Sequence, residues 1–91
     1  MKVFLSNEAA AQLSELLFYL ERRWSIRVRD NFLNKLTRNL TTIENMPYAY
    51  PESKKMPGIR KCVISPQTSL YYCVRQDRIE VLSIHDNRSQ D

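Results

Sequence analysis

Apolar residues recur every three or four positions along two stretches of the chain, residues 7–24 and 25–46. This spacing places them on one side of an amphipathic helix. Ser6 or Asn7, and later Ser25, supply the side-chain oxygens that cap helix starts. Pro47 ends the second pattern, because proline lacks the backbone N–H that a helix needs. The two stretches predict an antiparallel helical hairpin with core positions at Leu16, Leu20, Leu36, Leu40 and Ile43.

Four runs rich in β-branched and aromatic residues predict strands at residues 3–5, 59–64, 69–75 and 78–85. Short connections join the last three, which is typical of an antiparallel meander. Residues 47–58 hold three of the four prolines and the only glycine, and predict a long connecting loop. We therefore expect an α+β fold of order βααβββ, in which an antiparallel sheet packs on the N-terminal helical hairpin.

Some side chains can be placed on this expected fold. The adjoining Tyr71 and Tyr72 should face opposite sides of the sheet, because successive strand residues alternate. Trp24 and Met46, at the ends of the two helices, should cover the core. The length of 91 residues predicts a single domain spanning residues 1–91.

Composition excludes several classes of protein. No apolar run approaches the roughly 18 residues of a membrane span, and polar residues follow Leu5 too soon for a secretory signal. We therefore expect a cytoplasmic protein with no membrane partner. Cys62 and Cys73 are too few for a disulfide framework and are expected to be reduced thiols. With one histidine and one glycine, the chain offers neither metal-site spacing nor a phosphate loop, so no metal and no small-molecule cofactor are expected.

Fourteen Lys and Arg residues against ten Asp and Glu give a net charge of +4, which suits an acidic or polyanionic partner. One cluster, where the two helices meet, consists of Arg22, Arg23, Arg27 and Arg29. A second set, near the free end of the predicted sheet, consists of Arg60, Lys61, Arg75, His85 and Arg88. Cations on one face can hold a phosphodiester and a histidine can move protons near neutral pH, so this set is a candidate catalytic site. The alternative is that these residues form only the solvated face of the strands.

The segments GIRKCVISPQTSLYYCV at residues 58–74 and IEVLSIHDNR at residues 79–88, with the helix pair and the Pro-rich loop, resemble the RelE/ParE toxin superfamily of bacterial type II toxin–antitoxin modules. The resemblance covers nearly the whole chain. It implies a cognate antitoxin, acidic and partly disordered, whose C-terminal segment wraps the toxin across its helices and sheet. The arginine cluster between the helices and an opening strand at or near a sheet edge are expected to receive this antitoxin.

The resemblance implies two different targets. RelE-like members are ribosome-dependent mRNA endonucleases, whereas ParE-like members inhibit DNA gyrase and have no established hydrolytic centre. Arg60 and Arg88 match the nuclease pattern. Its catalytic lysine falls at Cys62, however, its third-strand arginine falls at or beside Ser69, and its C-terminal tyrosine has no counterpart. We therefore expect a ParE-like gyrase inhibitor that is not itself an enzyme. A RelE-like nuclease that uses His85, with the ribosome and mRNA as partners, and a non-toxic interaction domain on the same fold are the alternatives.

Overall fold

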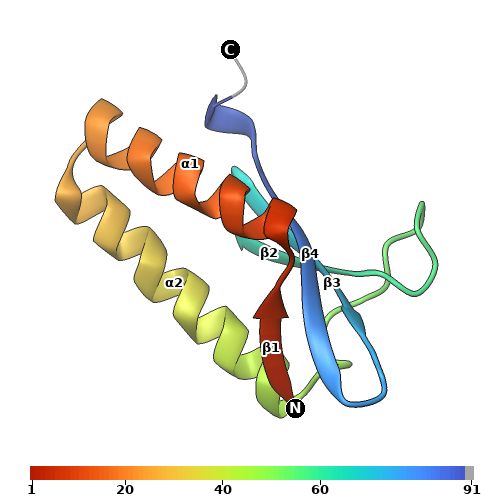
Figure 1. The fold of residues 1–91 in the computed structure, drawn as a ribbon. Helices are drawn as coiled ribbons and strands as arrows, with labels where there is room; N and C mark the ends of the chain where they lie inside the picture. The colour runs from red at the N-terminus through yellow and green to blue at the C-terminus, as the bar shows by residue number, and fades with distance from the viewer. Residues whose placement is uncertain (90–91) are drawn as a thin grey trace.

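The computed structural model describes residues 1–89 as a sheet with a helical hairpin packed on one face (Figure 1). In chain order the elements are β1 (Lys2–Leu5), α1 (Asn7–Arg23), α2 (Ile26–Asn45), β2 (Arg60–Ser65), β3 (Thr68–Val74), β4 (Arg78–Asp86) and a short 3-10 helix, η1 (Asn87–Ser89). The predicted α+β order βααβββ is confirmed, and each predicted helix or strand ends within one residue of its observed bounds. Among the described residues, neither α1 nor α2 is long and apolar enough to cross a membrane.

The sheet has the strand order β1-β4-β3-β2, so β1 and β2 are its edge strands. β2, β3 and β4 pair antiparallel, as the predicted meander requires. β1 pairs with β4 in the parallel direction, with Val3 opposite Ile79, so the expectation of a purely antiparallel sheet is wrong at this strand. A tight hairpin turn forces neighbouring strands to be antiparallel. The helical hairpin and two strands separate β1 from β4 along the chain, so no such turn sets their relative direction.

Two serines fix the starts of the helices. Ser6 Oγ accepts a hydrogen bond from the Ala9 N–H at 3.0 Å, and Ser25 Oγ accepts one from the Val28 N–H at 3.1 Å. Ser6 also binds the sheet, because its hydroxyl donates to the Leu82 carbonyl at 2.9 Å. α1 therefore starts at a fixed point beside β4, with its apolar stripe turned toward the sheet.

The core lies between the hairpin and the inner face of the sheet. The predicted core positions Leu16, Leu20, Leu36 and Ile43 are at most 3% exposed, whereas Leu40 is only partly buried. The inner face of the sheet contributes the buried side chains of Leu70, Tyr72, Ile79, Val81 and Ile84. The apolar stripes read from the sequence are therefore the surfaces that the fold buries.

The expectation that Trp24 and Met46 cover the core is wrong, since their side chains are 60% and 58% exposed. Both are C-cap residues with non-helical backbone angles. The spacing that turns stripe residues toward the sheet therefore no longer applies to them. Trp24 instead adds an exposed ring to the tip of the hairpin, which projects beyond the sheet (Figure 1).

Side-chain alternation separates the two cysteines. Cys62 is fully buried on the inner face of β2, and burial raises the pKa of its thiol. Cys73 lies on the opposite face of β3, with Tyr71, while Tyr72 faces the core, so the two tyrosines face opposite sides of the sheet as predicted. Both cysteines are free thiols, in agreement with the sequence-based expectation. A disulfide cannot join side chains on opposite faces of one sheet.

Replacing Leu36 with alanine should lower the free energy of unfolding by about 2 to 5 kcal/mol, because it leaves a cavity in the core. Leu36 is 3% exposed and belongs to the cluster that both helices and the sheet share. Urea denaturation measures the change. Thr37→Ala, on the exposed side of the same helix, is the matched control and should change stability by less than about 0.5 kcal/mol. Equal midpoints for Leu36→Ala and the wild type would contradict this packing.

Candidate functional site

Neither α1 nor α2 covers the second face of the sheet (Figure 1). The strand register arranges its side chains in rows, with Lys61 opposite Tyr71 in one row and Ser69 opposite His85 in the next. Lys61 and His85 are exposed, and Tyr71 is partly exposed. The outward-facing side chains, which we call the open sheet face, are Phe4, Lys61, Val63, Ser69, Tyr71, Cys73, Glu80, Ser83 and His85.

A β-bulge decides which way the end of β4 faces. The pairing of β3 with β4 skips Leu82, which is an extra residue. Strict alternation from the buried Val81 would turn His85 toward the core. The extra residue reverses the alternation, so Asp86 is buried and His85 is exposed. The histidine therefore shares the open sheet face with Lys61.

Arg60 does not reach the open sheet face. It is the first residue of β2, and its side chain is on the same side of the strand as that of the buried Cys62. Its guanidinium donates to the Tyr50 carbonyl at 2.6 Å, and its Cζ lies 4.9 Å from the centre of the Tyr48 ring. Its Nη2 is also 3.9 Å from the Glu52 carboxylate. Arg60 thus holds the α2–β2 loop (residues 46–59) against the start of β2.

Arg88, in η1, is engaged with a buried carboxylate. Its guanidinium pairs with Asp86 at 2.9 Å and lies 3.4 Å from Thr68 Oγ1, and the Thr68 hydroxyl donates to the same carboxylate. Burial pushes the pKa of Asp86 up, but hydrogen bonds from Arg88 and Thr68 outweigh burial and hold that pKa below its usual value. The Asn87 N–H also donates to the Gln67 carbonyl at 3.0 Å. These contacts fix the end of β4 to the β2–β3 turn.

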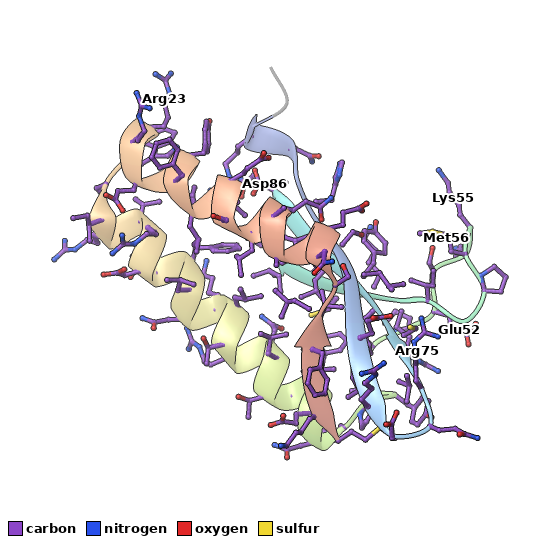
Figure 2. All side chains as sticks on the ribbon, viewed as in Figure 1. Arg23, Glu52, Lys55, Met56, Arg75 and Asp86 are labelled. Carbon is purple, nitrogen blue, oxygen red and sulfur yellow. The ribbon has the colours of Figure 1, made fainter. Side chains whose placement is uncertain are left out.

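The remaining candidate cations, Arg75 and Lys61, also lie at separate places on the fold. Arg75 follows β3 and pairs with Glu80 at 2.9 Å (Figure 2). Lys61 lies on the open sheet face, with its Nζ 6.0 Å from the centre of the Tyr71 ring. The structure therefore does not gather the five candidate catalytic residues on one face, since only Lys61 and His85 share the open one. No three His, Cys, Asp or Glu side chains in residues 1–89 form a metal-binding group.

A hollow of about 550 Å³ lies between the open sheet face and the α2–β2 loop. Its lining includes Pro51, Lys54, Lys55, Lys61, Val63 and Tyr71. The sequence patterns did not predict it, because contacts with residues distant in the chain position the loop. The Tyr72 hydroxyl, for example, donates to the Pro47 carbonyl at 2.6 Å. Tyr50, an aromatic residue of the Pro-rich loop that packs against the core, was the available signal that this loop belongs to the fold.

The second basic region forms the tip of the helical hairpin. Arg22 and Arg23 end α1, and Arg27 and Arg29 lie in the first turn of α2. Arg29 pairs within the hairpin, with Glu21 and Asp30. The other three arginines make no ion pair with any residue in the described range 1–89, and Arg23 points away from the fold (Figure 2).

Exposed apolar side chains accompany these arginines. Phe18, Trp24 and Ile26 are 61%, 60% and 56% exposed. The guanidinium of Arg22 lies 5.1 Å from the centre of the Phe18 ring. The hairpin tip therefore combines apolar contact area with unpaired cations, a composition typical of protein-binding surfaces.

A family model matches almost the whole sequence. Its description is "ParE toxin of type II toxin-antitoxin system, parDE", and the match covers residues 3–90. The chain belongs to this ParE toxin family. The predicted membership of the RelE/ParE superfamily is thereby confirmed. No curated protein sequence matches this ParE family member.

Solved toxin structures share its fold. A chain of the chromosomal ParDE TA system from P. aeruginosa superposes with a TM-score of 0.80 at 15% identity, covering 94% of this chain and 95% of that chain. For the YoeB/ParE toxin from Agrobacterium tumefaciens the TM-score is 0.69 at 18% identity, with coverage of 96% and 99%. For a chain of the E. coli DinJ–YafQ toxin–antitoxin complex it is 0.66 at 14% identity, with coverage of 98% and 94%. Identities this low establish a common fold alone.

Asp86→Asn should destabilise this toxin at pH 7 by about 1 to 3 kcal/mol, because it removes a buried charge that binds Arg88 and Thr68. The folded-state pKa of Asp86 is lowered, so its ionisation adds stability above the unfolded pKa of about 3.9, and this contribution is lost as pH falls toward the folded value. Thermal melts from pH 7 to pH 2 should therefore show a smaller acid-induced loss in the variant than in the wild type.

The control for this measurement is Glu80→Gln. Glu80 pairs with an arginine whose side chain is 53% exposed, so its removal should cost less than about 1 kcal/mol. Parallel pH curves for Asp86→Asn and the wild type would show that the buried pair contributes nothing to acid stability.

Proposed function

We propose that this ParE family toxin inhibits DNA gyrase and is neutralised by a cognate antitoxin. The observation that carries the proposal is the position of the two arginines that match the nuclease pattern. Arg60 is tied to the Tyr50 carbonyl and Arg88 to the buried Asp86, so neither guanidinium is directed at the open sheet face. Cleavage of a phosphodiester depends on cations that converge on the developing charge. Their separation supports inhibition by binding rather than by hydrolysis.

Inhibition by binding needs no proton transfer from the toxin. It needs contact surface, which the exposed apolar side chains supply at two places. Phe4 and Val63 are 46% and 57% exposed on the open sheet face, and Phe18 and Trp24 extend the hairpin tip. Apolar anchors surrounded by cations suit a large protein target, because burying the anchors contributes affinity and the charges orient the approach.

A RelE-like ribosome-dependent mRNA nuclease is the second candidate function. Lys61, Tyr71 and His85 share the open sheet face, and they would supply a cation, a stacking ring and a proton carrier. A non-toxic interaction domain on the same fold is the third candidate.

The antitoxin partner is supported by similar structures that are described as a toxin–antitoxin system or complex. We place its contact at the hairpin tip. Arg22, Arg23 and Arg27 present cations beside the exposed Phe18 ring, which suits an acidic segment with apolar anchors. Arg29 joins α2 to Glu21 of α1 and so supports the geometry of the tip.

Purified toxin incubated with gyrase, ATP and supercoiled plasmid should trap cleaved DNA, which appears as linear plasmid on a gel after the protein is denatured. The same preparation should leave ribosome-bound mRNA intact when primer extension is used to map its ends. His85→Ala should retain the effect on gyrase, because the proposed inhibition does not use proton transfer by this residue.

The same pair of assays separates the alternatives. Cuts at fixed codon positions that disappear in His85→Ala would reject the gyrase proposal and make the histidine the proton carrier of a nuclease. Inactivity toward both targets would support the interaction domain. Pre-incubation with the antitoxin is the control and should abolish whichever activity is present.

Reversing two charges at the hairpin tip, with Arg23→Glu and Arg27→Glu together, should weaken antitoxin binding by about tenfold or more and reduce the dependence of affinity on salt. Titration calorimetry at two salt concentrations measures both effects. Arg38→Glu with Arg78→Glu, on the exposed side of α2 and at the start of β4, is the charge-matched control. Equal losses in the two double variants would show that net charge, and not the tip, determines binding.

A further inference from the structure

The outer edge of β1 carries unpaired backbone groups. The Ser6 N–H, at the end of this strand, donates to the Val81 carbonyl of β4 at 2.9 Å. Backbone groups of alternate strand residues point to the same side, so Phe4 also bonds toward β4, while the N–H and C=O groups of Val3 and Leu5 point away from the sheet. Within residues 1–89 no hydrogen bond reaches these outward groups. An open strand edge of this kind is a template for another strand.

The side chains of β1 offer apolar surface on both faces of the sheet. Phe4 is 46% exposed on the open sheet face, where the Arg78 guanidinium lies 5.6 Å from the centre of its ring. Val3 and Leu5 are partly buried and pack against the core from the helix side. β1 is an edge strand, so no strand of the described chain lies beyond these side chains (Figure 1). The edge therefore combines open hydrogen-bonding groups with apolar contact area.

This edge is complementary to itself. When β1 lies antiparallel to a second β1 about a two-fold axis at Phe4, Val3 of each copy is opposite Leu5 of the other. The outward N–H and C=O groups of these residues then bond to each other on both sides of the axis. The two Phe4 side chains become a non-hydrogen-bonded cross-strand pair, in which side chains approach most closely. Any other antiparallel register leaves outward groups of Val3 or Leu5 unpaired.

The charges at this edge also fit an antiparallel copy. Lys2 opens β1, and Glu8 is exposed in the first turn of α1, which follows the strand. Neither forms an ion pair in the described chain. The two-fold register places Lys2 opposite Ser6 of the second copy, close to the turn that carries Glu8, so opposite charges approach at both ends. The two Lys2 residues stay about 13 Å apart along the strands, beyond the screening length of about 8 Å.

We propose that this ParE family toxin forms a symmetric dimer by antiparallel pairing of its β1 strands about Phe4, which joins two sheets into one. This inference goes beyond the proposed function, because it depends on neither gyrase nor the antitoxin. An acidic peptide fits this edge less well, since Glu8 repels it at one end. A strand of this length buries little area, so the dimer is expected to be weak, with a dissociation constant in the micromolar range.

Cysteine cross-linking tests the register. Phe4→Cys should form a disulfide-linked dimer on mild oxidation, because the Cα atoms of a non-hydrogen-bonded pair lie within disulfide reach. It is made in a Cys73→Ser background, which leaves only the buried Cys62 as a native thiol. Lys2→Cys in the same background is the matched control and should stay unlinked, because its two copies lie too far apart. Links in both variants, or in neither, would overturn the pairing.

Sedimentation measures the strength of the dimer. The wild-type mass should rise toward that of a dimer as the concentration approaches about 500 µM. Phe4→Glu places two carboxylates opposite each other and should raise the dissociation constant by about tenfold or more, whereas Phe4→Tyr should change it by no more than about threefold. Lys2→Glu should also weaken the dimer, and adding Glu8→Lys should restore it. A monomer at all concentrations, or a dimer unaffected by Phe4→Glu, would contradict the proposal.

Amide exchange of the wild type gives a readout that needs no variant and decides the question if Phe4→Glu fails to fold. The Val3 and Leu5 amides should exchange more slowly as the toxin concentration rises, because they gain hydrogen bonds. The Phe4 amide, which already bonds toward β4, should change less. Protection of Val3 and Leu5 that appears only when the antitoxin is added would assign this edge to the antitoxin and overturn the dimer.

Discussion

The apolar layer between the helical hairpin and the sheet is the constraint on which the rest of the structure depends, because it covers only one of the two faces of the sheet. Successive side chains of a strand point to opposite faces. Where the pairing is regular, a strand residue therefore faces either the helical hairpin or the open sheet face. Tyr72 is completely buried in this layer, while Tyr71 lines the hollow on the other side. By the same alternation, Cys62 and Val63 face opposite sides of the sheet, and so do Arg60 and Lys61.

The α2–β2 loop becomes part of the fold through polar contacts with the sheet and α2. Tyr72 donates to the Pro47 carbonyl and Arg60 to the Tyr50 carbonyl, so two side chains of the sheet bind the backbone of the loop. Burial raises the pKa of Tyr72, so its hydroxyl stays protonated to more alkaline pH than that of a free tyrosine. The Tyr50 hydroxyl in turn donates to Asn39 of α2 at 2.9 Å. These contacts position the loop as one wall of the hollow beside β2, so the same interactions serve both stability and a binding surface.

The cations of this ParE family toxin divide into those that the fold uses and those that remain for partners. Arg29, Arg60, Arg75 and Arg88 each approach a carboxylate of the same chain. The lysines beside the β2 edge and three arginines of the hairpin tip form no ion pair in the described part of the chain. Of the ten lysines and arginines that make no ion pair within residues 1–89, six lie at the hairpin tip or beside β2, and the other four are Lys2, Lys35, Arg38 and Arg78. The net charge of +4 favours the approach of an acidic partner.

The sequence by itself determined the helices, the strands and the core, because those features depend on local periodicity. Leu16, Leu20, Leu36 and Ile43 follow the helical spacing and are buried. The sequence also identified the charged residues of the candidate site, but it did not show which of them share a face of the sheet. The parallel direction of β1 and the extra residue at Leu82, which turns His85 outward, arise from pairing between distant segments. The engagement of Arg60 and Arg88 by the α2–β2 loop and a buried carboxylate has the same origin. Periodicity is a property of neighbouring residues, and only the tertiary structure decides which strand, loop or carboxylate each of them meets.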